Sequence, residues 1–210
     1  RRPRVRVDAR VISLGNITAG GTGKTPAVIE RAWKEIGAGH RVAVLTRGYG
    51  ARSEEPMAVH VGKGSPALCA SLGDEPALIA TRVPEALIVR CADRVAAARK
   101  AIGEYDCDTL ILDDGYQYVQ LERDENVLVI DATNPFGNGR LIPRGILREP
   151  LEAMARATHI ILTRCDQADS FESILDAAAA YCPEAPIRRT RHVPSVLWRV
   201  SNGEQLPLTR

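Results

Sequence analysis

A glycine-rich segment directly after a short apolar run constrains the fold more than any other part of the sequence. Residues 11–26 read VISLGNITAGGTGKTP. This order predicts a strand, a tight turn and then a helix that begins near Thr25. Glycines let the backbone N–H groups of such a turn converge on an anion, and the positive end of the helix dipole lies at the same point. The segment therefore predicts a phosphate-binding loop, and the alternative is a tight turn without a ligand.

The side chains of this loop predict a nucleoside triphosphate and Mg²⁺ as ligands. Lys24 is placed to reach the β- and γ-phosphates, and the Thr25 hydroxyl is placed to ligate Mg²⁺. The strict pattern G-x-x-x-x-G-K-[ST] is not met, because Thr18 stands at its first glycine. The expected nucleotide-binding residues of the loop are Thr18, Ala19, Gly20, Gly21, Thr22, Gly23, Lys24 and Thr25.

The rest of the chain alternates short β-branched runs with longer alanine-rich amphipathic stretches. This pattern predicts βα units and a mainly parallel sheet flanked by helices, the α/β architecture of P-loop NTPases. Asp93 and Ser170 are expected helix N-caps, and Gly37 and Gly103 are expected helix ends. Residues 133–148 are rich in Gly, Pro and Arg, which is typical of a functional loop. The expected strands are 11–14, 41–46, 86–89, 109–112, 126–130 and 159–162, and the expected helices are 25–36, 75–82, 93–102, 150–156 and 170–181.

Two carboxylates follow the apolar strand expected at 109–112. Asp113 and Asp114 precede Gly115 and have the form of a Walker B element, in which one carboxylate helps to hold Mg²⁺. The other carboxylate can hold a water or polarise a nucleophile. The alternative is a solvated turn opened by Asp and Gly. The residues alone do not assign separate roles to the two carboxylates.

Three further side chains are candidates for a site. Asp74 precedes an expected helix, where it is either an N-cap or a carboxylate that faces the carboxyl edge of the sheet. Arg47 follows an expected strand at the edge where open α/β sheets bind ligands, and it either contacts a substrate phosphate or lies in a surface turn. Glu149 either enters the metal shell or begins the next helix.

Composition narrows the class of protein. Hydrophobic residues make up 45% and charged residues 26% of the chain, which excludes a disordered protein, and a net charge of +2 gives no argument for nucleic acid. Five cysteines without a Cys-x-x-Cys pair indicate a reducing cytosol. No apolar run approaches the ~20 residues of a membrane span, so we expect a soluble protein. Three arginine clusters each fit phosphate groups, an anionic membrane surface or a solvated face. They are Arg1, Arg2, Arg4, Arg6 and Arg10, then Arg140, Arg144 and Arg148, and finally Arg188, Arg189 and Arg191.

Six short motifs occur in one order along the chain. They read GNITAGGTGKTP (15–26), TRGYG (46–50), GDEP (73–76), DDGYQ (113–117), FGNG (136–139) and REP (148–150). In this order they resemble the tetraacyldisaccharide 4′-kinases, and the resemblance covers roughly residues 11–164. Thr18 at the first P-loop glycine is itself usual in that family.

The resemblance implies transfer of the ATP γ-phosphate to the 4′-hydroxyl of a tetraacylated glucosamine disaccharide 1-phosphate, the lipid A precursor. The implied place is the cytoplasmic face of the bacterial inner membrane, with the chain as a peripheral monomer that binds no nucleic acid. Asp74 is implied to act with a later histidine as a catalytic dyad. The other implied roles are catalysis by Lys24 and Asp114, ATP contacts from Gln117 and Tyr118, Mg²⁺ contacts from Thr25, Asp113, Asp114 and Glu149, and lipid head-group contacts from Arg47 and Tyr49.

The sequence departs from the family pattern at three places. Tyr118 stands where the family usually has histidine. The family's N-terminal membrane-associating helix is not seen before Arg1, and its C-terminal lobe with the dyad histidine is not seen either. We therefore expect a kinase domain at 1–182 and the start of a truncated C-terminal lobe at 183–210. The alternatives are an ATPase switch of the deviant-Walker kind and a truncated relative that only binds nucleotide.

Overall fold

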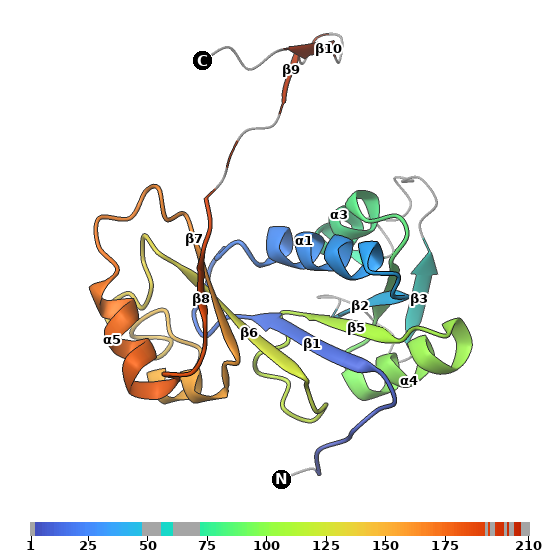
Figure 1. Cartoon of the computed structure of the whole chain (residues 1–210), viewed down its shortest axis with the longest axis horizontal. Helices are drawn as coiled ribbons and strands as arrows, with labels where there is room; N and C mark the ends of the chain where they lie inside the picture. The colour runs from blue at the N-terminus through green and yellow to red at the C-terminus, as the bar shows by residue number, and fades with distance from the viewer. Residues whose placement is uncertain are drawn as a thin grey trace.

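Eight strands form one sheet in the order β3-β4-β2-β5-β1-β6-β7-β8 (Figure 1). The computed structural model describes residues 3–47, 56–60, 72–191, 193, 196–199, 201 and 204–206. All neighbouring strands of this sheet are parallel except β3, which pairs antiparallel with β4. The strands are β1 (Arg10–Gly15), β2 (Val42–Thr46), β3 (Met57–His60), β4 (Leu87–Arg90), β5 (Thr109–Asp113), β6 (Glu125–Asp131), β7 (His159–Thr163) and β8 (Ile187–Arg189).

Helices cover both faces of the sheet, which is why its central strands are buried along their whole length. The helices α1 and α3 pack on one face through one core cluster, while α4, η1 and α5 pack on the other face through two clusters. A separate antiparallel hairpin of β9 (Leu197–Arg199) and β10 (Glu204–Leu206) follows. The helices are α1 (Lys24–Gly37), α3 (Asp74–Arg82), α4 (Arg94–Tyr105), the 3₁₀-helix η1 (Leu151–Arg156) and α5 (Glu172–Tyr181).

The α/β architecture expected from the sequence is confirmed, and all six expected strands are present within one or two residues of their expected bounds. Asp93 is the N-cap of α4, where its carboxylate accepts hydrogen bonds from the N–H groups of Val95 and Ala96. Two expectations about helix ends are wrong. Gly103 lies inside α4 because that helix runs on to Tyr105, and the N-cap of α5 is Phe171 rather than Ser170.

The strands of the main sheet that periodicity missed lie at its two edges. β3 and β8 have only four and three residues, too few for an alternation pattern to stand out. The helix expected at 150–156 is a 3₁₀-helix.

β8 lies beyond residue 182 and is still a strand of the main sheet, and the division into two domains stays a prediction. Among the helices described here, none is long and apolar enough to cross a bilayer.

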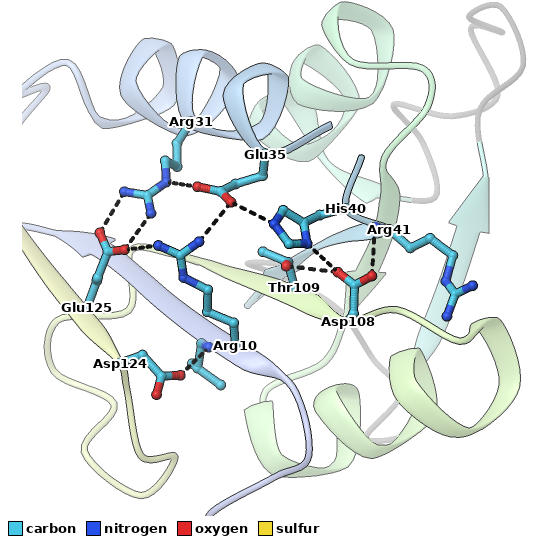
Figure 2. Close-up of polar contacts among 10 residues, drawn as sticks. Arg10, Arg31, Glu35, His40, Arg41, Asp108, Thr109, Asp124 and Glu125 are labelled. Carbon is cyan, nitrogen blue, oxygen red and sulfur yellow. Dashed lines mark hydrogen bonds and ion pairs between the residues drawn. The ribbon is translucent and has the colours of Figure 1, made fainter. Parts of the chain in front are cut away.

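An ion network joins α1 to the amino ends of the central strands (Figure 2). Arg31 of α1 makes two hydrogen bonds of 2.7 Å with Glu125 of β6 and a third of 2.7 Å with Glu35, one helical turn further on. Arg10 of β1 contacts both carboxylates from the other side. Because the Glu35 side chain is only 4% exposed, these arginines neutralise a charge that would be costly to bury alone.

We expect Glu125→Gln to lower the free energy of unfolding by about 2 kcal/mol at pH 7, because two arginines would then face an uncharged amide. Hydrogen bonds from Arg31 hold the pKa of Glu125 at about 2, below its ordinary 4.5. A lowered folded-state pKa gives a stabilisation that is complete above about pH 5 and is lost as the pH falls toward 2. Urea unfolding at pH 7 and pH 3 checks this, because the difference from the wild type should shrink at pH 3.

The matched control is Glu104→Gln. Glu104 pairs with Lys100 at 2.7 Å, but its side chain is 58% exposed, so its loss should cost less than about 0.5 kcal/mol. Equal losses in the two variants would contradict a stabilising network beneath α1.

Candidate functional site

The carboxyl ends of the central parallel strands place most of the sequence-predicted site residues along one edge of the sheet. Two cavities lie along this edge, of about 580 and about 320 Å³. They share Arg47 and Asp114 as wall residues. The larger is lined by Arg47, Ala92, Arg94, Asp114, Gln117, Tyr118, Ile142 and Arg148, and the smaller by Thr46, Arg47, Leu72, Gly73, Asp74, Glu75, Pro76, Asp113 and Asp114.

The predicted phosphate-binding loop lies between β1 and α1. Gly23 is the N-cap of α1 with a φ of 81°, a left-handed conformation that favours glycine. A Cβ added at Gly23 would lie 3.0 Å from the Thr163 methyl, so a larger residue is also crowded there. Ala19, Gly20 and Gly21 are exposed at the tip of the loop. The start of α1, whose first N–H groups have no partner within the helix, therefore follows an exposed loop, as an anion site requires.

The Asn16 side chain organises this loop from inside. Asn16 is fully buried, and its amide nitrogen donates to the hydroxyl oxygens of Thr22 at 3.1 Å and Thr18 at 3.4 Å. Its amide oxygen accepts a 3.2 Å hydrogen bond from the Lys24 ammonium. One side chain thus fixes both ends of the loop and the lysine. The sequence analysis did not single out Asn16, although a polar residue directly after a buried strand was the available signal.

The end of β7 supports the loop from a second direction. The Thr163 hydroxyl donates to the backbone oxygen of Thr22 at 2.9 Å. Arg164 donates to the backbone oxygen of Gly21 at 3.2 Å and forms an ion pair with Asp131 of β6. These contacts hold two backbone carbonyls of the loop, and no short sequence pattern indicated them.

The long loop of 133–148 returns to the phosphate-binding loop and pairs with it along the backbone. The N–H of Ala19 donates to the oxygen of Ile146 at 2.6 Å, and the N–H of Arg148 donates to the oxygen of Ile17 at 2.7 Å. Thr18 and Leu147 form the antiparallel bridge between these bonds. The pairing explains how Arg148 and Glu149, distant in sequence, reach the site.

Asp113 and Asp114 lie at the end of β5, level with the start of the loop. Asp113 is 6% exposed, and burial, with Glu75 and Asp114 nearby, raises its pKa to about 6. Asp114 has a φ of 49°, and its carboxylate accepts from Arg148 at 2.8 Å and lies 3.6 Å from the Lys24 ammonium. Asp114 therefore faces Lys24 and Arg148, while Asp113 beside it is buried.

Gln117 joins the loop to Glu149. Its amide nitrogen donates to the backbone oxygen of Asn16 at 2.8 Å and to the Glu149 carboxylate at 2.9 Å. Arg156 of η1 binds both oxygens of Glu149 at 2.8 Å. Glu149 thus lies just before η1, which was one of the two positions expected for it. Its carboxylate accepts hydrogen bonds from Arg156 and from the Gln117 amide.

Tyr118 lies on the wall of the larger cavity beside Arg94. Its hydroxyl donates to the Asp93 carboxylate at 2.9 Å, and the Arg94 guanidinium lies 5.9 Å from the ring centre. Burial raises the pKa of Tyr118, and the hydrogen bond to Asp93 acts in the same direction. At pH 7 this side chain is therefore a neutral group attached to the start of α4. Arg94 is itself 3% exposed, and burial lowers its pKa.

Asp74 is the first residue of α3 and is exposed on the wall of the smaller cavity. The N-cap is Gly73, and no side chain caps the helix, so the interpretation of Asp74 as an N-cap is wrong. Its cavity also contains Asp113 and Asp114, which brings it to the same edge as the phosphate-binding loop. Arg47 lies between the two cavities. Tyr49 lies outside the described residues.

Known sequences match over nearly the whole chain. The family model of tetraacyldisaccharide-1-P 4′-kinase (LpxK) matches residues 1–210. The tetraacyldisaccharide 4′-kinase of Anaeromyxobacter sp. (strain K) is 43% identical over 197 residues, which are 93% of this chain and 52% of that protein. The one from Geobacter sulfurreducens is 47% identical over 160 residues, 76% of this chain and 45% of that protein. The chain thus spans about half the length of the curated relatives it matches.

Solved structures agree with the sequence matches. LpxK from Aquifex aeolicus, crystallised in complex with ATP, superposes with a TM-score of 0.78 at 30% identity and covers 98% of this chain and 61% of its own. The hydrogenase maturation factor HypB from Archaeoglobus fulgidus gives a TM-score of 0.54 at 15% identity over 88% of this chain and 82% of its own, which reflects the fold alone. By sequence and by structure, the chain belongs to the tetraacyldisaccharide 4′-kinase family.

Proposed function

We propose that the chain transfers the γ-phosphate of ATP to the 4′-hydroxyl of tetraacyldisaccharide 1-phosphate, a step of lipid A biosynthesis. One observation carries the proposal: the Lys24 ammonium, at the start of the helix after a glycine-rich loop, lies 3.6 Å from Asp114, which lines the cavities that also contain Arg47, Asp74 and Arg148. An anion-binding loop, basic groups and a free carboxylate are the parts that phosphoryl transfer to an alcohol requires. Relatives that carry the name of this kinase support the acceptor.

The loop and Lys24 bind the β- and γ-phosphates of ATP in this proposal. The Lys24 ammonium donates a 3.2 Å hydrogen bond to the Asn16 amide oxygen, so its charge is positioned before the nucleotide arrives. Gln117 and Tyr118 contribute the remaining nucleotide contacts. An ATP complex of the Aquifex aeolicus relative supports this part of the proposal.

The donor set at the end of β5 fits a Mg²⁺ ion. Among the described residues, one buried oxygen of Asp114 has no hydrogen-bond partner and lies 3.6 Å from the Lys24 ammonium, and burial raises the pKa of the neighbouring Asp113, as expected of carboxylates placed for a cation. Thr25, Asp113 and Asp114 would hold the ion, with Glu149 as a further ligand once it leaves Arg156. The ion would neutralise charge on the transferring phosphate.

Asp74 acts on the acceptor hydroxyl, orienting or deprotonating it. It lies exposed in a cavity that also reaches Asp113 and Asp114, so a sugar hydroxyl bound there faces the transferring phosphate. Arg47 and Tyr49 bind the head group of the lipid substrate. We further propose that the enzyme works as a monomer on the cytoplasmic face of the inner membrane and that nucleic acid is not among its partners.

We expect Lys24→Ala to slow phosphoryl transfer by about 10²–10³-fold, because the variant lacks the positive charge that stabilises the negative transferring phosphate. The measurement is the appearance of label from [γ-³²P]ATP in tetraacyldisaccharide 1-phosphate dispersed in detergent micelles with Mg²⁺. Lys34→Ala, in the last turn of the same helix, is the matched control and should transfer at the wild-type rate. A normal rate for Lys24→Ala would exclude this mechanism.

Asp74→Asn should lower kcat by about 10²-fold or more and leave ATP affinity within about twofold, because the carboxylate acts on the acceptor and not on the nucleotide. Single-turnover transfer and equilibrium binding of a labelled ATP analogue separate these two quantities. Asp176→Asn, an exposed helical aspartate on α5, serves as control. A parallel loss of ATP affinity would place Asp74 at the nucleotide instead.

The same assays, together with the oligomeric state of the chain with ATP, distinguish the rival functions. ATP-dependent dimerisation without label in the lipid would indicate a nucleotide switch. ATP binding without dimerisation and without label in the lipid would indicate a binding protein. Both results would contradict the kinase proposal for this chain.

A further inference from the structure

A turn at residues 140–145, here called the apolar turn, presents two large hydrophobic side chains to solvent beside the candidate site. Leu141 is 47% exposed and Ile142 is 54% exposed. Ile142 also lines the larger cavity, together with Arg94 and Arg148. Single exposed hydrophobic residues are common, but two adjacent ones, of which one lines a cavity of the candidate site, mark a contact surface.

Backbone hydrogen bonds fix the shape of the apolar turn. The N–H of Ile142 donates to the oxygen of Leu147 at 2.9 Å, and the N–H of Leu147 donates to the oxygen of Arg140 at 3.1 Å. Within the turn, the N–H of Arg144 donates to the oxygen of Leu141 at 2.9 Å. The two apolar side chains are therefore displayed by an ordered turn, so a partner that covers them pays little ordering entropy.

The base of the apolar turn is anchored in the core. Phe136 and Leu147, on either side of it, are 8% and 2% exposed and pack in the core cluster beneath η1 and α5. A Cβ added at Gly145 would lie 2.2 Å from the backbone oxygen of Arg140, so the chain can close here only with glycine. The same segment that anchors Leu147 thus projects Leu141 and Ile142 outward.

The charge around the apolar turn has one sign. Between Asp131 and Glu149 the sequence contains three arginines and no acidic residue. Arg148 is committed to Asp114, whereas Arg140 and Arg144 are exposed and make no ion pair with any described residue. Exposed hydrophobic side chains flanked by unpaired cations match a surface that is both anionic and apolar, as a bilayer of anionic lipids is.

We propose that the apolar turn inserts into an anionic lipid bilayer, with Leu141 and Ile142 among the acyl chains and Arg140 and Arg144 at the head-group phosphates. This inference rests on the proposed function, because a bilayer at Ile142 brings a lipid head group to the mouth of the cavity that contains Arg94 and Arg148. The turn thus supplies both membrane attachment and the direction from which the acceptor enters.

Sedimentation with vesicles of phosphatidylglycerol and phosphatidylethanolamine tests the proposal on the 210-residue chain without nucleotide. We expect the double variants L141S/I142S and R140Q/R144Q each to weaken partitioning about tenfold or more. The matched controls are L78S/L175S, which removes two equally exposed leucines on α3 and α5, and R82Q/R99Q, which makes the same change in net charge. Both controls should stay within about twofold of the wild type.

A spectroscopic arm reports insertion itself. Ile142→Trp should shift tryptophan emission to shorter wavelength with vesicles and be quenched by lipids brominated on the acyl chain, after subtraction of the wild-type signal. Leu175→Trp should show neither effect.

Three results would overturn the proposal: no vesicle binding by the wild type, equal losses in the controls, or losses confined to R140Q/R144Q, which would leave a purely electrostatic contact. Transfer of label by the wild type in detergent micelles reports the proposed function separately. Normal transfer with unaltered vesicle binding in L141S/I142S overturns the inserted turn alone. No transfer, with vesicle binding lost only in the turn variants, overturns the kinase proposal alone.

Discussion

The hydrogen bonds of the buried Asn16 amide are the constraint on which the candidate site depends. This one side chain forms hydrogen bonds with Thr18, Thr22 and Lys24. The backbone oxygen of Asn16 accepts a further hydrogen bond from the Gln117 amide. A buried amide is costly unless both its donor and its acceptor are used, and here the phosphate-binding loop supplies those partners. The loop therefore has one favourable arrangement with respect to β1, and Lys24 is positioned by the same contacts. The support of Lys24 is thus a buried side chain inside the protein.

The Asp114 carboxylate balances positive charge at the candidate site. It faces Lys24 and Arg148, the cations that an incoming triphosphate would also attract. Asp113 next to it is buried, close to Glu75, and has a pKa raised to about 6. Asp113 is buried whereas Asp114 contacts cations, because successive side chains at the end of a strand point to opposite faces of the sheet. Asp114 also has a positive φ, which changes the direction of its side chain. A ligand that carries both phosphate and a divalent cation would satisfy both sets of charges at once.

The elements that obey a strong local pattern could be predicted from the sequence. Composition and hydrophobic periodicity identify buried strands and amphipathic helices. The P-loop motif is identifiable because its glycines permit the backbone conformation that binds an anion. The contacts of Thr163 and Arg164 with the loop could not be predicted, because each is a single side chain that meets a backbone oxygen more than 140 positions away. The 3₁₀ form of η1 and the short edge strands were missed for a related reason, since tertiary packing and not propensity decides them. Asp74 was open to two interpretations because a residue before a helix reads as a cap, and only the placement of Gly73 excluded that one.

The hydrogen bond from Thr163 to Thr22 and the backbone pairing of Ile146–Arg148 with Ile17–Ala19 bear on the order in which the protein matures. The phosphate-binding loop leaves the ribosome before its supports, which lie roughly 125–140 residues later in the chain. Closing such distant contacts is slow compared with forming a local helix. A nascent chain with its glycine-rich loop already synthesised therefore lacks the finished form of that loop until β7 has joined the sheet. In the proposed function, nucleotide binding is then a late event of biogenesis, and it distinguishes chains that have completed their sheet from those that have not.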